Sequence, residues 1–153
     1  MKTLIQRVKY AGVKVEGKTV GQIDGGLLVF IGVQKGDKEE QADFLSKKIC
    51  NLRIFEDENG KMNKSLFDVK GQMLVVSQFT LCADTSRGNR PGFENAALPA
   101  DAEKLYEYFS KKVRELGIFV QNGVFGADMK VELLNDGPVT LMIENRSNLV
   151  DKI

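Results

Sequence analysis

Apolar and polar residues alternate along the first part of the chain, which is the pattern of strands that bury one face. The alternation runs over residues 3–9 and 13–15, and a turn at Glu16-Gly17-Lys18 leads into residues 19–23, which predicts a hairpin. Residues 27–33 are apolar at nearly every position. Such a strand is covered on both faces, so we expect it at the centre of a sheet.

Two stretches have the spacing of amphipathic helices. The first covers about residues 38–51 and begins with Asp37 and Glu40 in an arrangement like a capping box. The second begins at Pro99, a residue suited to a first helical turn, and is stopped by Gly117. The chain therefore has two helices with which to cover a sheet.

The remaining strand candidates lie in the second half of the chain. Residues 73–76 form a short apolar run, and strands are also predicted at 118–121, 129–134 and 139–144. The last two are joined by Asn135-Asp136-Gly137-Pro138, whose residue types favour a hairpin turn. The Gly-Pro pair also exposes main-chain atoms that could form a rigid pocket wall, so a functional interpretation stays open.

About seven or eight strands, two main helices and mostly hairpin connections predict an α+β fold with a curved, largely antiparallel, barrel-like sheet. Residues 1–153 are expected to form a single domain, because no repeat or linker divides them and one core suffices for this length. A long irregular connection is expected over residues 82–98, and such connections are often functional.

Charge and residue usage narrow the possible functions. The chain has 22 basic and 21 acidic residues, which argues against binding long stretches of DNA or RNA and leaves room only for a small RNA footprint. No secretory signal or membrane-length apolar run is visible, so a soluble, cytoplasmic protein without a membrane partner is expected. Cys50 and Cys82 are expected to be reduced thiols.

The chain contains no histidine. This excludes Ser-His-Asp and Cys-His catalysis and the zinc sites that contain histidine. We therefore expect no metal and no cofactor.

The residues Ser77-Gln78-Phe79-Thr80 follow the strand predicted at 73–76 and bring two hydroxyls and an amide to its end. They could simply satisfy local backbone hydrogen bonds. Alternatively, backbone N–H groups and hydroxyls of this turn could hold an ester carbonyl as it becomes an oxyanion. The base would then be Asp84, a lysine or a group of the substrate, unless Thr80 is itself the nucleophile.

The predicted connection at 82–98 contains Arg87 and Arg90 between glycines, an arrangement that could grip a phosphate or could be a solvated loop. The basic residues of the two predicted helices are interpreted as solvated faces: Lys47, Lys48, Lys111, Lys112 and Arg114.

At this point the chain resembles the D-aminoacyl-tRNA deacylase family, also known as the D-tyrosyl-tRNA deacylase family. The resemblance rests on Ser77 to Thr80 and Asn135 to Thr140, and on six further blocks in the expected order. These are residues 6–8, 25–29, 52–55, 60–63, 88–91 and 125–129.

The resemblance implies an enzyme that hydrolyses D-aminoacyl-tRNA, and glycyl-tRNA mischarged on another tRNA, as a proofreading step in translation. It also implies a homodimer in which a cis Gly137-Pro138 enters the partner's pocket at Ser77 to Thr80 and leaves no room for an L-amino acid. Arg7 would brace this motif, and Met129 would border the pocket. The attacking water would be activated by Thr80 or by the 2′-hydroxyl of the terminal adenosine.

Two other classes of function remain as alternatives. One is a non-catalytic domain that binds aminoacyl-tRNA or its synthetase, and the other is an esterase or amidase that acts on free D-amino acid derivatives. The absence of any conventional triad makes the second less favoured.

Overall fold

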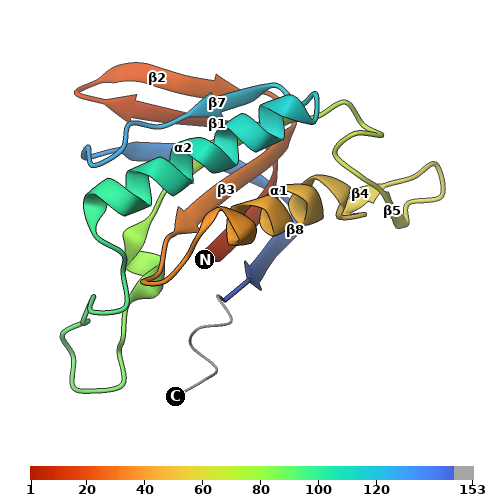
Figure 1. Ribbon diagram of the computed structural model, residues 1–153. Coiled ribbons are helices and arrows are strands. Elements are labelled where there is room, and N and C mark those ends of the chain that lie inside the picture. The colour runs from red at the N-terminus through yellow and green to blue at the C-terminus, as the bar shows by residue number, and fades with distance from the viewer. Residues whose placement is uncertain (147–153) are drawn as a thin grey trace.

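The computed structural model describes residues 1–146 of the chain, which form two α-helices, eight strands and a short 3₁₀-helix (Figure 1). The elements in chain order are β1 (Lys2–Val15), β2 (Lys18–Ile23), β3 (Gly26–Gly32), α1 (Glu39–Asn51), β4 (Phe55–Glu56), β5 (Met62–Lys64), β6 (Gln72–Ser77), η1 (Phe79–Cys82), α2 (Pro99–Glu115), β7 (Val120–Asn122) and β8 (Lys130–Glu144).

The main sheet has the order β2-β1-β3-β6-β7, and β8 pairs with the other edge of β1. The pairs of β1 with β2, β3 and β8 are antiparallel, whereas β3–β6 and β6–β7 are parallel. The parallel pairs arise because α1 and α2 connect these strands as crossovers. The predicted α+β class is confirmed, with a mixed sheet that is antiparallel around β1.

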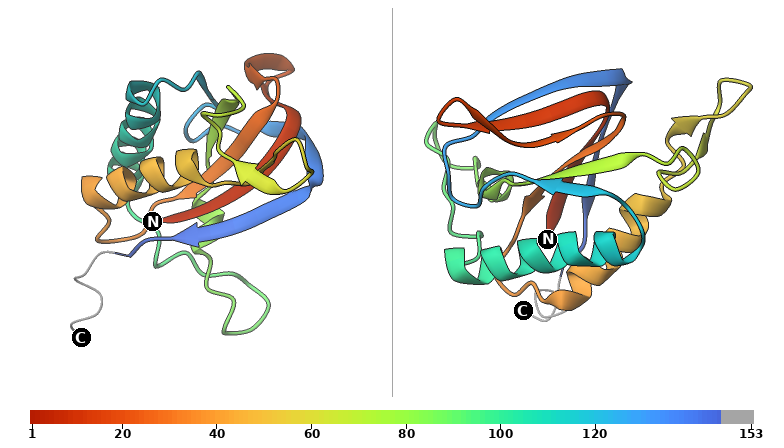
Figure 2. Two further views of the ribbon diagram at one scale, coloured as in Figure 1. Left: turned by 90° about the vertical axis from the view of Figure 1, so that its right-hand side faces the viewer. Right: turned by 90° about the horizontal axis from the view of Figure 1, so that it is seen from above.

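The sheet is nearly closed into a barrel because its two ends meet. A Cβ built on Gly21 of β2 would lie 2.4 Å from the carbonyl oxygen of Asn122 in β7, so only glycine allows this approach. Both helices lie on one side of the sheet, as Figure 2 shows in its right-hand view. The β4–β5 hairpin projects away from the body on the other side from η1 (Figure 1).

Buried residues form two clusters, one on each face of the sheet. Leu27 and Val29 of β3 join the cluster under the helices, and Leu28 joins the cluster inside the curve of the sheet. The prediction of a central strand covered on both faces is therefore confirmed. No helix in residues 1–146 is long and apolar enough to cross a membrane.

The predicted hairpin is confirmed, because β1 pairs with β2, and β1 is one continuous strand with irregular pairing to β8 between Val8 and Ala11. Two predictions about local structure were wrong. First, Asp37 does not cap α1, because its carboxylate accepts hydrogen bonds from the Met1 ammonium at 2.8 Å and the Gln34 N–H at 2.6 Å. The cap comes instead from Gln41, whose side chain accepts from the Lys38 N–H at 2.7 Å.

The second wrong prediction is the hairpin at Asn135 to Pro138. Both halves of β8 pair with β1, so the chain does not reverse there. Between the pairs Gln6–Thr140 and Val8–Asn135, β1 advances by two residues and β8 by five. The extra residues form a bulge at the sheet edge, because a bulge places unpaired residues outside the ladder of hydrogen bonds.

Candidate active site

The turn from Ser77 to Thr80 lies where β6 leaves the sheet. The Gln78 N–H donates to the Ile31 carbonyl at 2.7 Å, and η1 begins at the next residue. Gly32, at the end of β3, lets η1 sit directly on the strand, because a Cβ there would lie 3.0 Å from Cys82 Sγ and 3.1 Å from the Gln78 carbonyl oxygen. The backbone of this turn is thus fixed to the end of β3.

Several donors of this turn have no acceptor in the described part of the chain. They are the Ser77 hydroxyl and the N–H groups of Phe79 and Thr80. Phe79 is 56% exposed and Thr80 is also exposed, so the turn faces solvent. Three free donors within four residues are the groups that could hold a carbonyl oxygen as negative charge develops on it.

No base stands next to these donors. The Thr80 hydroxyl accepts a hydrogen bond from the Gln78 side-chain amide, and an amide N–H cannot take a proton. The Asp84 carboxylate accepts from the Ser86 N–H at 2.9 Å, and hydrogen bonds from Ser86 lower its pKa. Asp84 is therefore a weak base. Across residues 1–146 there is no group of side chains suited to hold a metal ion.

The Gly137-Pro138 peptide bond is cis, and both residues are exposed on the bulge of β8. Gly137 has φ +122°, and a Cβ built on it would lie 2.9 Å from Arg7 Nη2 and 3.0 Å from Val139 Cγ2. Both the backbone conformation and the packing therefore require glycine here.

Arg7 holds this bulge from inside the sheet and is only 5% exposed. Its Nε donates to the Asp136 carbonyl at 3.1 Å, and its Nη1 donates to the Ile54 carbonyl at 2.7 Å. The Asp136 carboxylate lies 3.5 Å from Arg7 Nε and equally far from Lys9 Nζ. The guanidinium thus ties the residue before Gly137 to the chain that precedes β4.

One chain does not bring the two motifs together. Ser77 pairs with Ile31, Ile31 with Thr3, and Thr3 with Ile143, so β3 and β1 lie between them. Three strand spacings amount to about 14 Å, and Gly137 is displaced further along β8. Figure 2, left, shows β8 at the edge of the sheet beside β1.

Met129 lies closer to the Ser77 turn than Gly137 does. It packs against the cluster that contains Val76, and its Sδ would be 2.7 Å from a Cβ built on Gly123. The Gly123 N–H donates to the Val75 carbonyl at 3.1 Å, which places Met129 beside the carboxyl end of β6.

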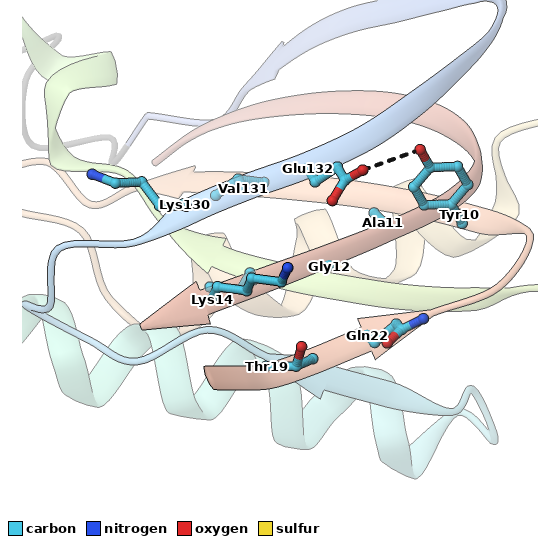
Figure 3. Close-up of a pocket in the computed structure, with 10 residues that line it drawn as sticks. Tyr10, Ala11, Gly12, Lys14, Thr19, Gln22, Lys130, Val131 and Glu132 are labelled. Carbon is cyan, nitrogen blue, oxygen red and sulfur yellow. Dashed lines mark hydrogen bonds between the residues drawn. The ribbon is translucent and has the colours of Figure 1, made fainter. Parts of the chain in front are cut away.

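Three cavities differ in their relation to these motifs. One of about 470 Å³ lies over β1, β2 and β8, with Gly12 in its lining and a 3.4 Å hydrogen bond from Tyr10 to Glu132 at one end (Figure 3). It contains no residue of either motif, and sequence reasoning missed it because strands distant in sequence form it. A second, of about 360 Å³, includes Lys9 and Asp136. The third, of about 230 Å³, lies in the loop that follows η1.

Comparison with known proteins gives one consistent result. The family model described as D-Tyr-tRNA(Tyr) deacylase matches residues 4–144. The chain is 60% identical over 148 residues to the D-aminoacyl-tRNA deacylase of Geotalea uraniireducens, covering 97% of this chain and 96% of that protein. It is 53% identical to the D-aminoacyl-tRNA deacylase of Bacillus cytotoxicus, covering 95% and 100% respectively.

Solved structures similar to this one include the following two. The c-Myc DNA Unwinding Element Binding Protein has a TM-score of 0.91 and 39% identity, with 96% of this chain and all of that one covered. A probable eukaryotic D-amino acid tRNA deacylase has a TM-score of 0.78 and 17% identity, covering 93% and 97%, which supports the fold.

Proposed function

We propose that this chain, which belongs to the D-Tyr-tRNA(Tyr) deacylase family, is an enzyme that hydrolyses the ester between a D-amino acid and the 3′ end of tRNA. The free donors of the Ser77 to Thr80 turn carry this proposal, because an ester carbonyl needs such donors as it becomes tetrahedral. The products are the free D-amino acid and the tRNA with its terminal hydroxyl restored. The activity is a proofreading step in translation and takes place in the cytoplasm.

The reaction begins with the ester carbonyl oxygen between the Ser77 hydroxyl and the N–H groups of Phe79 and Thr80. Water attacks the carbonyl carbon, and negative charge moves to the carbonyl oxygen. The bond between the carbonyl carbon and the ribose oxygen then breaks as the ribose oxygen takes the proton that the attacking water gives up. Each donor of such a site is worth roughly 3 to 4 kcal/mol of transition-state stabilisation. Gln78 orients the turn through its hydrogen bond to Thr80.

The 2′-hydroxyl of the terminal adenosine activates the water. Two observations support this choice over Thr80: the chain has no histidine, and the hydrogen-bond partner of the Thr80 hydroxyl is a donor. A tRNA that ends in 2′-deoxyadenosine should then be deacylated far more slowly. Thr80→Ala should retain most of the activity on normal tRNA, and loss of nearly all of it would return the nucleophile role to Thr80.

The site is completed by a second copy of the chain in a homodimer. Its Gly137 and Pro138 lie against the partner's turn, and their rigid main-chain atoms leave no space for the side chain of an L-amino acid. D-aminoacyl and glycyl esters fit the same space. Arg7 holds this wall in place through its bond to the Asp136 carbonyl, and Met129 borders the pocket.

Exposed apolar side chains support the dimer. Leu134 is 51% exposed and Met142 55% exposed, both on β8, and Phe79 at the turn is 56% exposed. A second copy that places its β8 against this turn would remove these side chains from water, which is favourable.

Deacylation of matched D-, L- and glycyl-tRNA tests the proposal directly. Hydrolysis of the D- and glycyl esters with survival of the L-ester is the expected result, and equal rates for D and L would refute the chiral filter. A protein that binds but hydrolyses none of them would instead be a non-catalytic domain.

Mixing two variants tests the shared site. Ser77→Ala disables the pocket, and Gly137→Ala disrupts the wall. After the subunits exchange, the mixture contains heterodimers with one site built from unaltered parts of both chains. D-selective activity should reappear on mixing, whereas a site built from one chain would gain nothing.

A further inference from the structure

The loop between η1 and α2 projects from the body of the molecule beside the candidate active site (Figure 1, lower left). Its base is well defined: Asp84 and Gly92 exchange two backbone hydrogen bonds of 2.7 and 2.9 Å. Further along, the Asn95 carbonyl accepts from the Lys35 N–H at 3.0 Å. The bridge between Asp84 and Gly92 closes the loop at its base, and residues 85–91 form its tip.

Arg87 and Arg90 lie on this tip, are exposed, and line the cavity of about 230 Å³. Neither forms a hydrogen bond or an ion pair with any residue in the range 1–146. Asp84 and Glu94 line the same cavity, yet the Asp84 carboxylate is bound by the Ser86 N–H. Both guanidinium groups are therefore available to a ligand from outside the chain.

Three basic residues near the end of α2 differ from this pair. Lys111 and Lys112 lie 3.9 and 3.3 Å from Glu115, and Arg114 donates to the Asn122 side chain at 2.6 Å. Arg87 and Arg90 are neighbouring cations without an ion-pair partner in residues 1–146, although Asp84 and Glu94 line the same cavity.

The loop is joined to the active-site turn. Its base begins two residues after η1, and Phe93 packs its ring against Phe79 with the centroids 5.0 Å apart. Phe93 is 36% exposed and Phe79 56%, so the pair presents aromatic surface at the base of the loop that carries the two arginines. Cationic groups beside exposed aromatic rings are typical of sites for single-stranded nucleic acid.

We propose that Arg87 and Arg90 bind the phosphodiester groups of the unpaired nucleotides that precede the terminal adenosine of the substrate. This inference rests on the proposed function, because the ester at Ser77 to Thr80 fixes where the RNA chain must leave the site. A guanidinium fits two phosphate oxygens at once, which suits a small and well-oriented footprint. An unpaired base stacks on the exposed Phe79–Phe93 pair.

The test measures kcat and KM for D-aminoacyl-tRNA with Arg87→Ala, Arg90→Ala and the double variant. KM should rise roughly tenfold for each single change, as expected for loss of a hydrogen bond to a charged group, and kcat should stay within about twofold. The plot of log kcat/KM against log salt should become shallower by about 0.7 for each lost phosphate contact. Arg→Lys variants should fall between wild type and alanine.

The matched control is Lys47→Ala/Lys48→Ala on α1, which removes the same charge from an exposed surface outside the loop. Its KM and salt slope should remain those of wild type, and thermal unfolding of every variant checks the fold. If wild type deacylates D-aminoacyl-tRNA but the double arginine variant keeps both its KM and its salt slope, the assignment is overturned. If wild type itself does not deacylate D-aminoacyl-tRNA, the result refutes the proposed function rather than the role of the two arginines alone.

Discussion

Replacing Arg7 by methionine should weaken both the fold and the wall proposed at Gly137 and Pro138. Methionine fills much of the same buried space but donates no hydrogen bond. The change removes hydrogen bonds to the carbonyls of Ile54 at 2.7 Å and Asp136 at 3.1 Å. Bonds to charged groups contribute about 1.5 to 3 kcal/mol each.

The combined contribution of the two hydrogen bonds to stability is lowered by solvent, because the Asp136 side chain is 33% exposed and Lys9 remains beside it. Water can replace the bond at Asp136, whereas the carbonyl of Ile54 lies in the buried interior. We therefore expect a loss of about 3 kcal/mol in the free energy of unfolding. With a urea m-value of about 2 kcal/mol/M, the unfolding midpoint falls by roughly 1.5 M.

Urea unfolding followed by circular dichroism measures this loss of stability. Deacylation of matched D- and L-aminoacyl-tRNA measures whether the proposed wall still excludes the L-amino acid. Arg7→Met should lower the preference for D over L more than it lowers activity on D. Asp136→Asn is the control, since it removes only the partly exposed ion pairs with Arg7 and Lys9 and should cost less than about 1 kcal/mol. A midpoint for Arg7→Met equal to that of wild type would refute the role given to the two carbonyl bonds.

Three further outcomes follow from local geometry. Ser77→Ala should lower kcat roughly a hundredfold through loss of one donor to the developing oxyanion, with little change in the unfolding midpoint. Gly32→Ala should cost about 1 to 3 kcal/mol in urea unfolding, because its Cβ would lie 3.0 Å from Cys82 Sγ, whereas at Gly12 the nearest atom is 3.6 Å away and alanine should cost less. Burial raises the pKa of the Cys50 thiol to about 12, so its contribution to stability is present below about pH 9 and declines as pH rises toward 12. Cys50→Ala should remove that part of the pH dependence in urea unfolding, and in the native protein Cys50 should resist thiol reagents at pH 8.

The sequence predicted the elements that are determined by the local pattern of apolar and polar residues. The two helices, the doubly covered β3 and the position of Ser77 at a strand end all follow from periodicity and end signals. The parallel pairs β3–β6 and β6–β7 follow from helices that separate these strands, a signal that counting hairpins overlooked. In contrast, Asn135 to Pro138 has the same residue types in a hairpin and in a bulge, and only pairing of both halves with β1 distinguishes them.

The position of that bulge supports the proposal that a chain with few reactive groups selects its substrate by shape. β1 and β3 keep the bulge and the Ser77 turn apart, so a single chain cannot occupy its own pocket. In the proposed dimer, each part of the substrate meets a different element: the ester meets the turn, the amino acid meets the partner's bulge, and the phosphates meet the Arg87 and Arg90 loop. The turn contributes donors that do not titrate near neutral pH, since it contains no histidine, carboxylate or amine. Selectivity then depends on space and position, and Arg7 and Gly32 are the residues that keep those positions fixed.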